Sequence, residues 1–494
     1  MNHRLSITLL TSVLLFAACA TTRNAANLPS HHLEFADQID YLLSAPEIET
    51  AHTGILIQSA ETGEILYEKN SRKLFMPASN EKIPTSAAAL LNFGPEFRYL
   101  TSVYVTGAIE DSTLRGDVIV VGSGDPTLSF RFCADRDSCY IFRAWVDSLR
   151  SHGIRKIDGR IIGVDDVFDD EAIGYGWSVN NLSYAYSTQI GALMYNENEA
   201  RLVIRADSLG QPIRTRVFPD LGYLDIQSRL EVSPEETDVL VERVLGTNTI
   251  VITGKIKPGD RYVENISIHN PTGYFLAGLK RELEQLGIQV IGSVTDADVL
   301  IDRGFLQQRQ LLFSIQSKPF ADVMAVLLKE SQNLYAESFV KLLGHHFGAE
   351  GSFDEGAKVL KRTLERFGLV SDSYSYMDGS GLCRYNYISP SHLVNILRRM
   401  YVHPYGEVYR KCLTVAGVDG TLENRLKGTV AEGKIVGKTG TISNVRCLSG
   451  YAMTADGETL VFSTMFNNFL CSTSLITDIQ DQICMLMVSH RRQH

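Results

Sequence analysis

Alternating apolar and polar residues predict a β-hairpin near the start of the chain. The stretch from Gly54 to Tyr67 alternates in this way on both sides of a turn at Glu61-Thr62-Gly63. An alanine-rich run from Ser86 to Leu91 follows and favours a helix. Strand patterns return near the other end of the chain, at 433–437, 446–454 and 458–467. An amphipathic helix is predicted after them, at 474–489.

The region between these ends contains two kinds of pattern. Helical periodicity covers 319–328, 334–347 and 354–367. The segment from Ser102 to Arg303 instead has strand-like pieces between Gly, Asp and Asn turns, with one helix predicted from Thr272 to Leu286. The predicted strands of this segment are 117–121, 160–164, 200–205 and 249–256.

Strands at both ends of the chain that enclose helices predict an α+β fold, in which an antiparallel sheet is flanked by helices. The β-rich segment would then be inserted between the two halves of that domain. We predict a first part at 30–101, an inserted β-rich region of two small domains at 102–303, and a second part at 304–494.

Composition narrows the class of function. The 494 residues are 44% hydrophobic and 21% charged, which is typical of an ordinary globular protein. A net charge of -10 argues against nucleic acid as a partner, because binding a phosphate backbone depends on clustered Lys and Arg. No C-x-x-C spacing supports zinc, and the loop from Gly122 to Pro126 lacks the lysine of a phosphate-binding loop, so we predict no metal and no cofactor.

The N-terminus has the pattern of a secretory signal peptide over residues 1–19. Arg4 precedes an apolar run from Leu5 to Phe16, and Ala17-Ala18-Cys19 follows. Two interpretations of this segment remain open: a lipoprotein signal with acylated Cys19, or plain signal-peptide cleavage near the same place. Either predicts an oxidising compartment, in which Cys133 and Cys139 are the best candidate disulfide pair.

A serine and a lysine three residues apart form the first candidate for chemistry. Ser79 and Lys82 would lie on one helix face, where a neutral lysine can take the proton of a serine nucleophile. The same spacing recurs at Ser338 and Lys341, and a single S-x-x-K is expected by chance in a chain of this length. Pro84 predicts a distorted first turn, with the straight helix starting nearer that proline.

Two further motifs distinguish between the two matches. Ser331-Gln332-Asn333 lies between two predicted helices, and Lys438-Thr439-Gly440 is the one K-T-G of the chain. The order S-x-x-K, S-x-N, K-T-G is the signature of penicillin-binding proteins and class A β-lactamases, and Ser79 alone gives this order.

Each motif residue has an expected role. Ser79 would attack a carbonyl with Lys82 as base, Ser331 would relay a proton to the leaving amine, and Asn333 would hold Lys82 and the substrate amide. Lys438 and Thr439 would bind a substrate carboxylate, and Gly440 would admit the substrate backbone. The N–H groups of Ser79 and Thr441 would form the oxyanion hole.

With these motifs the chain resembles the D-alanyl-D-alanine carboxypeptidase/endopeptidases, which are class C low-molecular-mass penicillin-binding proteins. Similar blocks span nearly the whole mature chain: 124–128, 331–337, 378–382, 416–422 and 437–441. The resemblance implies a transpeptidase/β-lactamase-like domain split by two smaller domains. It also implies a periplasmic enzyme with peptidoglycan stem peptides as substrate and β-lactam antibiotics as covalent inhibitors, held at the outer membrane only if Cys19 carries lipid.

Three departures from the family pattern concern the site, and one of them is Pro84, which lies close enough to shift Lys82 relative to Ser79. Asn181 stands where members commonly have an acidic residue, and Cys383 stands where serine is usual. We expect Cys383 to be a packing change rather than a second nucleophile. The alternatives to a DD-peptidase are a β-lactamase, for which we find no glutamate at the class A spacing, and a non-catalytic peptidoglycan-binding protein.

Overall fold

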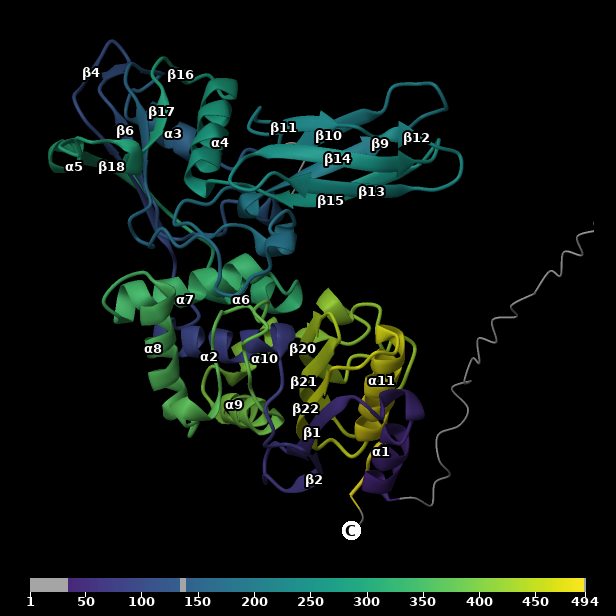
Figure 1. The fold of residues 1–494 in the computed structure, drawn as a ribbon. Coiled ribbons are helices and arrows are strands. Elements are labelled where there is room, and N and C mark those ends of the chain that lie inside the picture. The colour runs from purple at the N-terminus through teal and green to yellow at the C-terminus, as the bar shows by residue number, and fades with distance from the viewer. Residues whose placement is uncertain (1–33, 134–138, 493–494) are drawn as a thin grey trace, which may run out of the picture.

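The computed structural model describes residues 34–133 and 139–492, so the predicted signal peptide and Cys19 lie outside the described residues. A six-stranded antiparallel sheet forms the centre of the part that contains both chain ends (Figure 1). Its order is β19 (Thr414–Val415), β20 (Ile435–Ile442), β21 (Val445–Met453), β22 (Thr459–Asn467), β1 (His52–Ser59), β2 (Ile65–Lys69). The first predicted hairpin is confirmed as β1 and β2, and β22 joins them to the C-terminal strands.

Helices cover both faces of this sheet, because its strands carry apolar residues on both sides. One apolar cluster joins Ile55 and Phe462 to the helices α1 (Phe35–Leu43) and α11 (Thr473–Ser489). The other cluster joins the opposite face to a larger helical layer. That layer consists of α2 (Lys82–Phe93), α6 (Phe320–Lys329), α7 (Asn333–Phe347), α8 (Phe353–Glu365), α9 (Pro390–Val402) and α10 (Gly406–Cys412).

The inserted region forms two lobes above this core (Figure 1). One lobe contains the five-stranded sheet β17-β8-β6-β3-β18, the small sheet β16-β7-β5-β4 and the helices α3 to α5. Its strands are β3 (Leu100–Val105), β4 (Ala108–Glu110), β5 (Thr113–Arg115), β6 (Val118–Val121), β7 (Lys156–Ile157), β8 (Ile161–Val164), β16 (Gln289–Val290), β17 (Val294–Asp296) and β18 (Gln310–Gln316). Its helices are α3 (Arg143–Ser151), α4 (Pro271–Gln285) and α5 (Phe305–Gln308).

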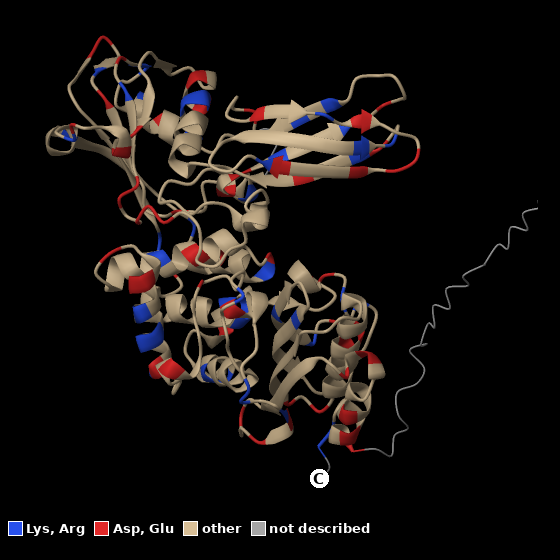
Figure 2. Cartoon of the chain, in the orientation of Figure 1, with Lys and Arg blue, Asp and Glu red and all other residues tan. Residues whose placement is uncertain are grey.

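The other lobe consists of two sheets, β10-β9-β15 and β11-β14-β12 with β13 paired to β14. Its strands are β9 (Glu199–Arg205), β10 (Arg214–Phe218), β11 (Asp225–Ser228), β12 (Glu231–Val232), β13 (Asp238–Arg243), β14 (Thr249–Ile256) and β15 (Arg261–Ser267). Inward residues such as Leu202, Ile204, Ile250 and Ile252 are fully buried between the sheets. Acidic and basic residues are interspersed over both the core and the inserted region (Figure 2).

The structure bears on two predictions for the inserted region. The predicted end at residue 303 stays a prediction, and β18, which lies beyond it, pairs with β3 in the five-stranded sheet. We therefore propose that the insertion runs from Leu100 to Gln316. The sequence pattern predicts one helix in this segment, yet α3 is a second, since Trp145, Val146 and Leu149 form a buried helical stripe.

The predicted Cys133–Cys139 disulfide is present, and the other five cysteines of the described residues are free. Among the described residues, none of the helices is both long enough and apolar enough to cross a membrane.

Candidate active site

The turn that contains Ser79 begins the helix α2. The residues from Ala78 to Glu81 form a 3₁₀ turn, η2, and the α-helix proper starts at Lys82. Pro84 is thus the third residue of α2, where a backbone amide has no partner within the helix, so its missing N–H is tolerated. The predicted distortion of the first turn is confirmed, although the helix starts two residues before Pro84.

Lys82 is fully buried and its ammonium nitrogen contacts three oxygen atoms. Its Nζ lies 2.9 Å from Ser79 Oγ, 2.6 Å from Asn333 Oδ1 and 2.8 Å from the Ser380 carbonyl oxygen. The amide and the carbonyl oxygen can only accept, whereas the serine hydroxyl can donate or accept. A neutral Lys82 would therefore give its two N–H groups to Asn333 and Ser380 and turn its lone pair toward Ser79.

Burial sets the charge of both motif lysines. It lowers the pKa of Lys82 to about 7, against the opposing effect of the carboxylates of Asp378, Glu337 and Glu81. Burial, helped by the positive charge of Lys82, also lowers the pKa of Lys438 well below its usual value. A substantial fraction of Lys82 is then neutral near pH 7, as a base for a serine hydroxyl requires.

Buried carboxyl groups hold the loop that supplies the Ser380 carbonyl. Glu337 of α7 accepts the N–H groups of Gly379 and Ser380, each at 2.9 Å. Asp378 accepts the N–H of Gly381 at 2.7 Å and the indole N–H of Trp177 at 2.9 Å. The contact of the Ser380 carbonyl with Lys82 ties the loop 378–382 to the motif residues.

The S-x-N motif joins the K-T-G motif through a second lysine contact. Ser331 lies between α6 and α7 in the left-handed backbone region, with φ of 60°. Lys438 projects from β20 and donates to Ser331 Oγ at 2.8 Å and to the Thr439 carbonyl at 2.9 Å. The structure thus brings Ser79, Lys82 and Asn333 into one hydrogen-bonded group and Ser331 and Lys438 into another.

The remaining K-T-G residues lie on β20 beside the Ser79 turn. Thr439 Oγ1 donates to Thr421 Oγ1 at 2.7 Å, and Thr441 is exposed, with its hydroxyl accepting from Arg446. A Cβ added to Gly440 would lie 2.6 Å from the Pro77 carbonyl oxygen and 3.2 Å from the Ser79 nitrogen. Glycine at 440 is therefore needed for the strand to approach the nucleophile turn, in addition to its expected role of admitting the substrate backbone.

The inserted region also contacts the motif residues, near the Asn181 position that the family resemblance had associated with the site. Asn333 Nδ2 donates to the Tyr186 carbonyl at 2.7 Å, and the Tyr186 hydroxyl donates to Asn181 Oδ1 at 3.2 Å. Cys383 packs with Trp177 and Leu182, and burial raises the pKa of its thiol to about 11. This setting supports the expected packing role, since the thiolate is the nucleophilic form.

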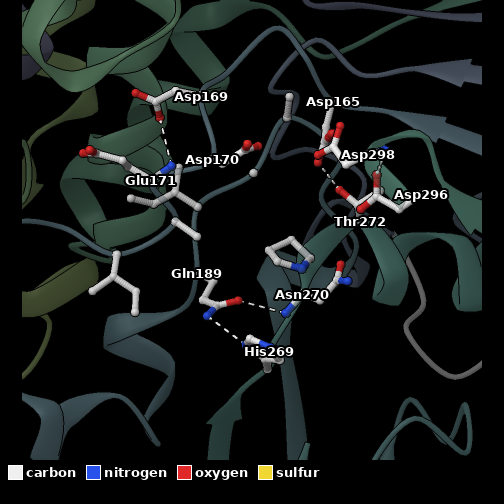
Figure 3. A pocket seen from close by; sticks show the side chains of 16 residues that line it. Asp165, Asp169, Asp170, Glu171, Gln189, His269, Asn270, Thr272, Asp296 and Asp298 are labelled. Carbon is white, nitrogen blue, oxygen red and sulfur yellow. Dashed lines mark hydrogen bonds between the residues drawn. The ribbon is translucent and has the colours of Figure 1, made fainter. Parts of the chain in front are cut away.

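A cavity of about 540 Å³ in the inserted region is lined by none of the motif residues (Figure 3). Carboxylate oxygens of Asp165, Asp296 and Asp298 lie within 4.8 Å of one another there. Thr272 donates to Asp165, and Arg303 pairs with Asp298. Since these carboxylates have protein partners, we assign them no ligand.

The geometry defines a class of protein before any comparison is made. An antiparallel sheet flanked by helices, with a serine beside a buried lysine and a second lysine on the neighbouring strand β20, is typical of serine enzymes that penicillins acylate. The chain belongs to the D-Ala-D-Ala carboxypeptidase 3 (S13) family, which it matches over residues 35–489. It is a serine-type carboxypeptidase by this membership.

Individual relatives agree with this assignment. The chain is 30% identical to the D-alanyl-D-alanine carboxypeptidase of an Actinomadura species over 473 residues, covering 92% of this chain and 85% of the relative. It is 26% identical to the D-alanyl-D-alanine carboxypeptidase DacB of Haemophilus influenzae, covering 85% and 86% of the two chains.

Solved structures support the fold. The crystal structure of penicillin binding protein 4 from Haemophilus influenzae superposes with a TM-score of 0.77 at 23% identity, covering 90% of this chain and 98% of the other. The same protein in complex with a β-lactam gives a TM-score of 0.73 at 22% identity, covering 92% and 99%.

Proposed function

We propose that the chain is a serine DD-peptidase that releases the terminal D-alanine of peptidoglycan stem peptides through an acyl-enzyme on Ser79. The observation that carries this proposal is the contact of Ser79 Oγ with the buried Lys82, whose pKa is lowered to about 7. A lysine in this state can remove the serine proton without a histidine.

The first step forms the acyl-enzyme. Ser79 Oγ attacks the carbonyl carbon of the penultimate D-alanine while Lys82 takes the hydroxyl proton. The backbone N–H groups of Ser79 and Thr441 stabilise the oxyanion. When the tetrahedral intermediate collapses, the C–N bond breaks and Ser331 passes a proton from Lys82 to the leaving D-alanine amine.

The substrate would be held by its terminal carboxylate. Lys438 and Thr439 bind that group, and Asn333 accepts from or donates to the substrate amide. Water then attacks the Ser79 ester and regenerates the enzyme. A cross-linked dimer has the same D-alanyl carbonyl, so this second step also serves hydrolysis of D-alanyl cross-links. A β-lactam presents a strained amide beside a carboxylate, which explains acylation by penicillin.

The location follows from the substrate. Peptidoglycan lies outside the cytoplasmic membrane, so the enzyme would work in the periplasm after export by the segment 1–19. Acylation of Cys19 would tether it to the outer membrane. Metabolic labelling with a radioactive fatty acid distinguishes acylation of Cys19 from plain signal-peptide cleavage. A lipoprotein would carry the label and lose it in a Cys19→Ser chain, whereas a plainly cleaved chain would carry no label.

Release of D-alanine from a pentapeptide tests the function. The purified protein should release one D-alanine per peptide and turn over a chromogenic cephalosporin slowly, since a stable acyl-enzyme blocks it. Rapid cephalosporin turnover without D-alanine release would favour a β-lactamase. Inertness toward both compounds would favour a non-catalytic wall-binding protein. Digestion of purified sacculi, with mass analysis of the fragments, then separates D-alanine loss from cross-link cleavage.

A further inference from the structure

Glu197 is a buried carboxylate of the inserted region that the proposed mechanism does not use. It lies in a short helical turn, η6 (Asn196–Asn198), and is only 3% exposed. All three residues of this turn have positive φ, of 47°, 57° and 54°. Residues other than glycine rarely adopt this backbone, so contacts from the surroundings must hold the turn in place.

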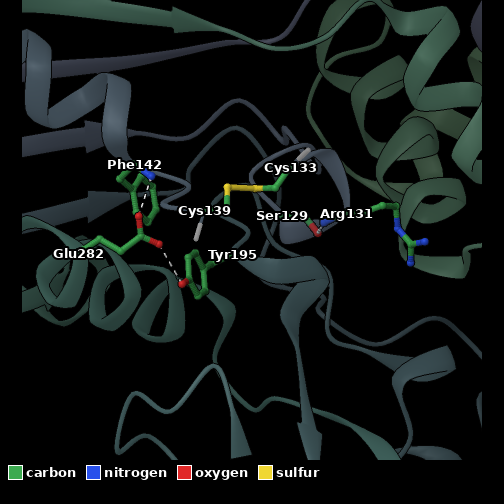
Figure 4. The surroundings of a disulfide bond; sticks show 7 residues. All are labelled: Ser129, Arg131, Cys133, Cys139, Phe142, Tyr195 and Glu282. Atoms are coloured by element: carbon green, nitrogen blue, oxygen red, sulfur yellow. Dashed lines mark hydrogen bonds between the residues drawn. A yellow bond between two sulfur atoms is a disulfide. The ribbon is translucent and has the colours of Figure 1, made fainter. Parts of the chain in front are cut away.

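The Glu197 carboxylate accepts hydrogen bonds from three side chains. Arg131 of the inserted region donates Nη2 to Oε2 at 2.9 Å and also bonds Oε1 through Nε. The other two donors belong to the core: Gln332 Nε2 donates to Oε2 at 2.7 Å, and the Tyr335 hydroxyl donates to Oε1 at 2.9 Å. Arg131 is itself placed by the segment that leads to the Cys133–Cys139 disulfide (Figure 4).

Gln332 is the middle residue of the S-x-N motif. On one side of it Ser331 accepts from Lys438, and on the other side Asn333 accepts from Lys82. Ser331 also has a positive φ, of 60°, so both turns that meet at the Glu197–Gln332 bond are conformationally costly. A contact that holds Gln332 therefore constrains the two flanking side chains.

We propose that Glu197 is a positioning residue for the peptidase reaction, which holds the Ser331-Gln332-Asn333 turn in its reactive geometry through Gln332. This inference rests on the proposed function. Glu197 contacts neither Ser79 nor either motif lysine, so it acts through the turn and not on the substrate.

The chain offers a matched control on the same helix. Lys341, later in α7, pairs with Asp169 of the inserted region and donates to the Glu171 carbonyl at 2.7 Å. This ion pair also ties the insertion to α7, as the hydrogen bonds of Glu197 do, but it touches none of the motif residues. An Asp169→Asn variant thus weakens the attachment of the insertion while leaving the S-x-N turn alone.

The test measures penicillin acylation and D-alanine release by full-length Glu197→Gln and Asp169→Asn chains. Glu197→Gln should lower the acylation rate and kcat by about 10- to 100-fold, because small displacements of reacting groups are costly, with KM changed less than about threefold. Asp169→Asn should keep both rates within about twofold of wild type, even where it lowers the melting temperature. Equal rate losses in the two variants, or a wild-type rate in Glu197→Gln, would overturn the proposal.

A Gln332→Ala variant tests the route and keeps the Arg131–Glu197 pair intact. If Glu197 acts through Gln332, a chain with both Glu197→Gln and Gln332→Ala should be acylated no more slowly than the slower of the two single variants. Rate losses that multiply would contradict this route. A wild-type chain that released no D-alanine would instead refute the proposed function, so the two failures are distinguishable.

Discussion

Two segments of the chain share the S-x-x-K spacing, and the structure gives them opposite surroundings. Ser79 and Lys82 begin a helix, with Lys82 Nζ 2.9 Å from the serine hydroxyl. Ser338 and Lys341 lie inside α7, where Ser338 Oγ donates to the Leu334 carbonyl at 2.8 Å and Lys341 pairs with Asp169. Both lysines are buried, at 0% and 3% exposed, so burial alone does not distinguish them.

The difference lies in the partners of each lysine nitrogen. Lys341 forms a direct ion pair with the carboxylate of Asp169, and Ser338 donates to a helix carbonyl instead of contacting the lysine. Lys82 contacts only uncharged oxygens, and the nearby carboxyl groups are bonded elsewhere or, for Glu81, have no hydrogen-bond partner among the described residues. A reactive lysine here is a buried lysine without a direct counter-ion.

The largest expected effect separates the two lysines. Lys82→Met should slow penicillin acylation by about 10²- to 10⁴-fold, since the general base is lost. Lys341→Met should leave acylation within about twofold but lower the free energy of unfolding by about 3 kcal/mol, because Asp169 loses its partner. Acylation kinetics measures the rate, and chemical denaturation measures the free energy of unfolding. Loss of acylation in Lys341→Met with a normal rate in Lys82→Met would show that Lys341, and not Lys82, is the base.

A smaller effect concerns pH. Because the pKa of Lys82 is lowered to about 7, the neutral base is scarce below that value and dominant above it. The acylation rate should therefore rise about tenfold from pH 6 to pH 8, with an apparent pKa near 7. The Lys341→Met chain should give the same profile. A rate that is flat or falls over this range would show that a protonated lysine is needed instead.

The smallest effect is expected for the second serine. Ser338→Ala removes a hydroxyl bonded within its own helix, so the free energy of unfolding should change by no more than about 1 kcal/mol. Acylation and the site of labelling should stay as in wild type. Thermal melts measure the stability of this variant, and labelled penicillin measures its acylation. A large loss of penicillin labelling would show that Ser338 belongs to the active site.

Much of the site could be predicted because its motifs are short and local. Ser79, Lys82, Ser331 and Lys438 were selected by their order, and the structure brings them together. The Ser380 carbonyl, Tyr186 and Glu197 could not be found in this way, because each reaches the motifs through long-range packing. The pairing of β18 with β3 was missed for the same reason, since these strands are far apart in sequence.

The most direct test of the central claim is peptide mapping of the chain after reaction with labelled penicillin. We predict one adduct per chain, on the peptide that contains Ser79, and none in a Ser79→Ala chain that still folds. An adduct on the Ser338 peptide, or one that persists in Ser79→Ala, would contradict the assignment of Ser79 as the nucleophile.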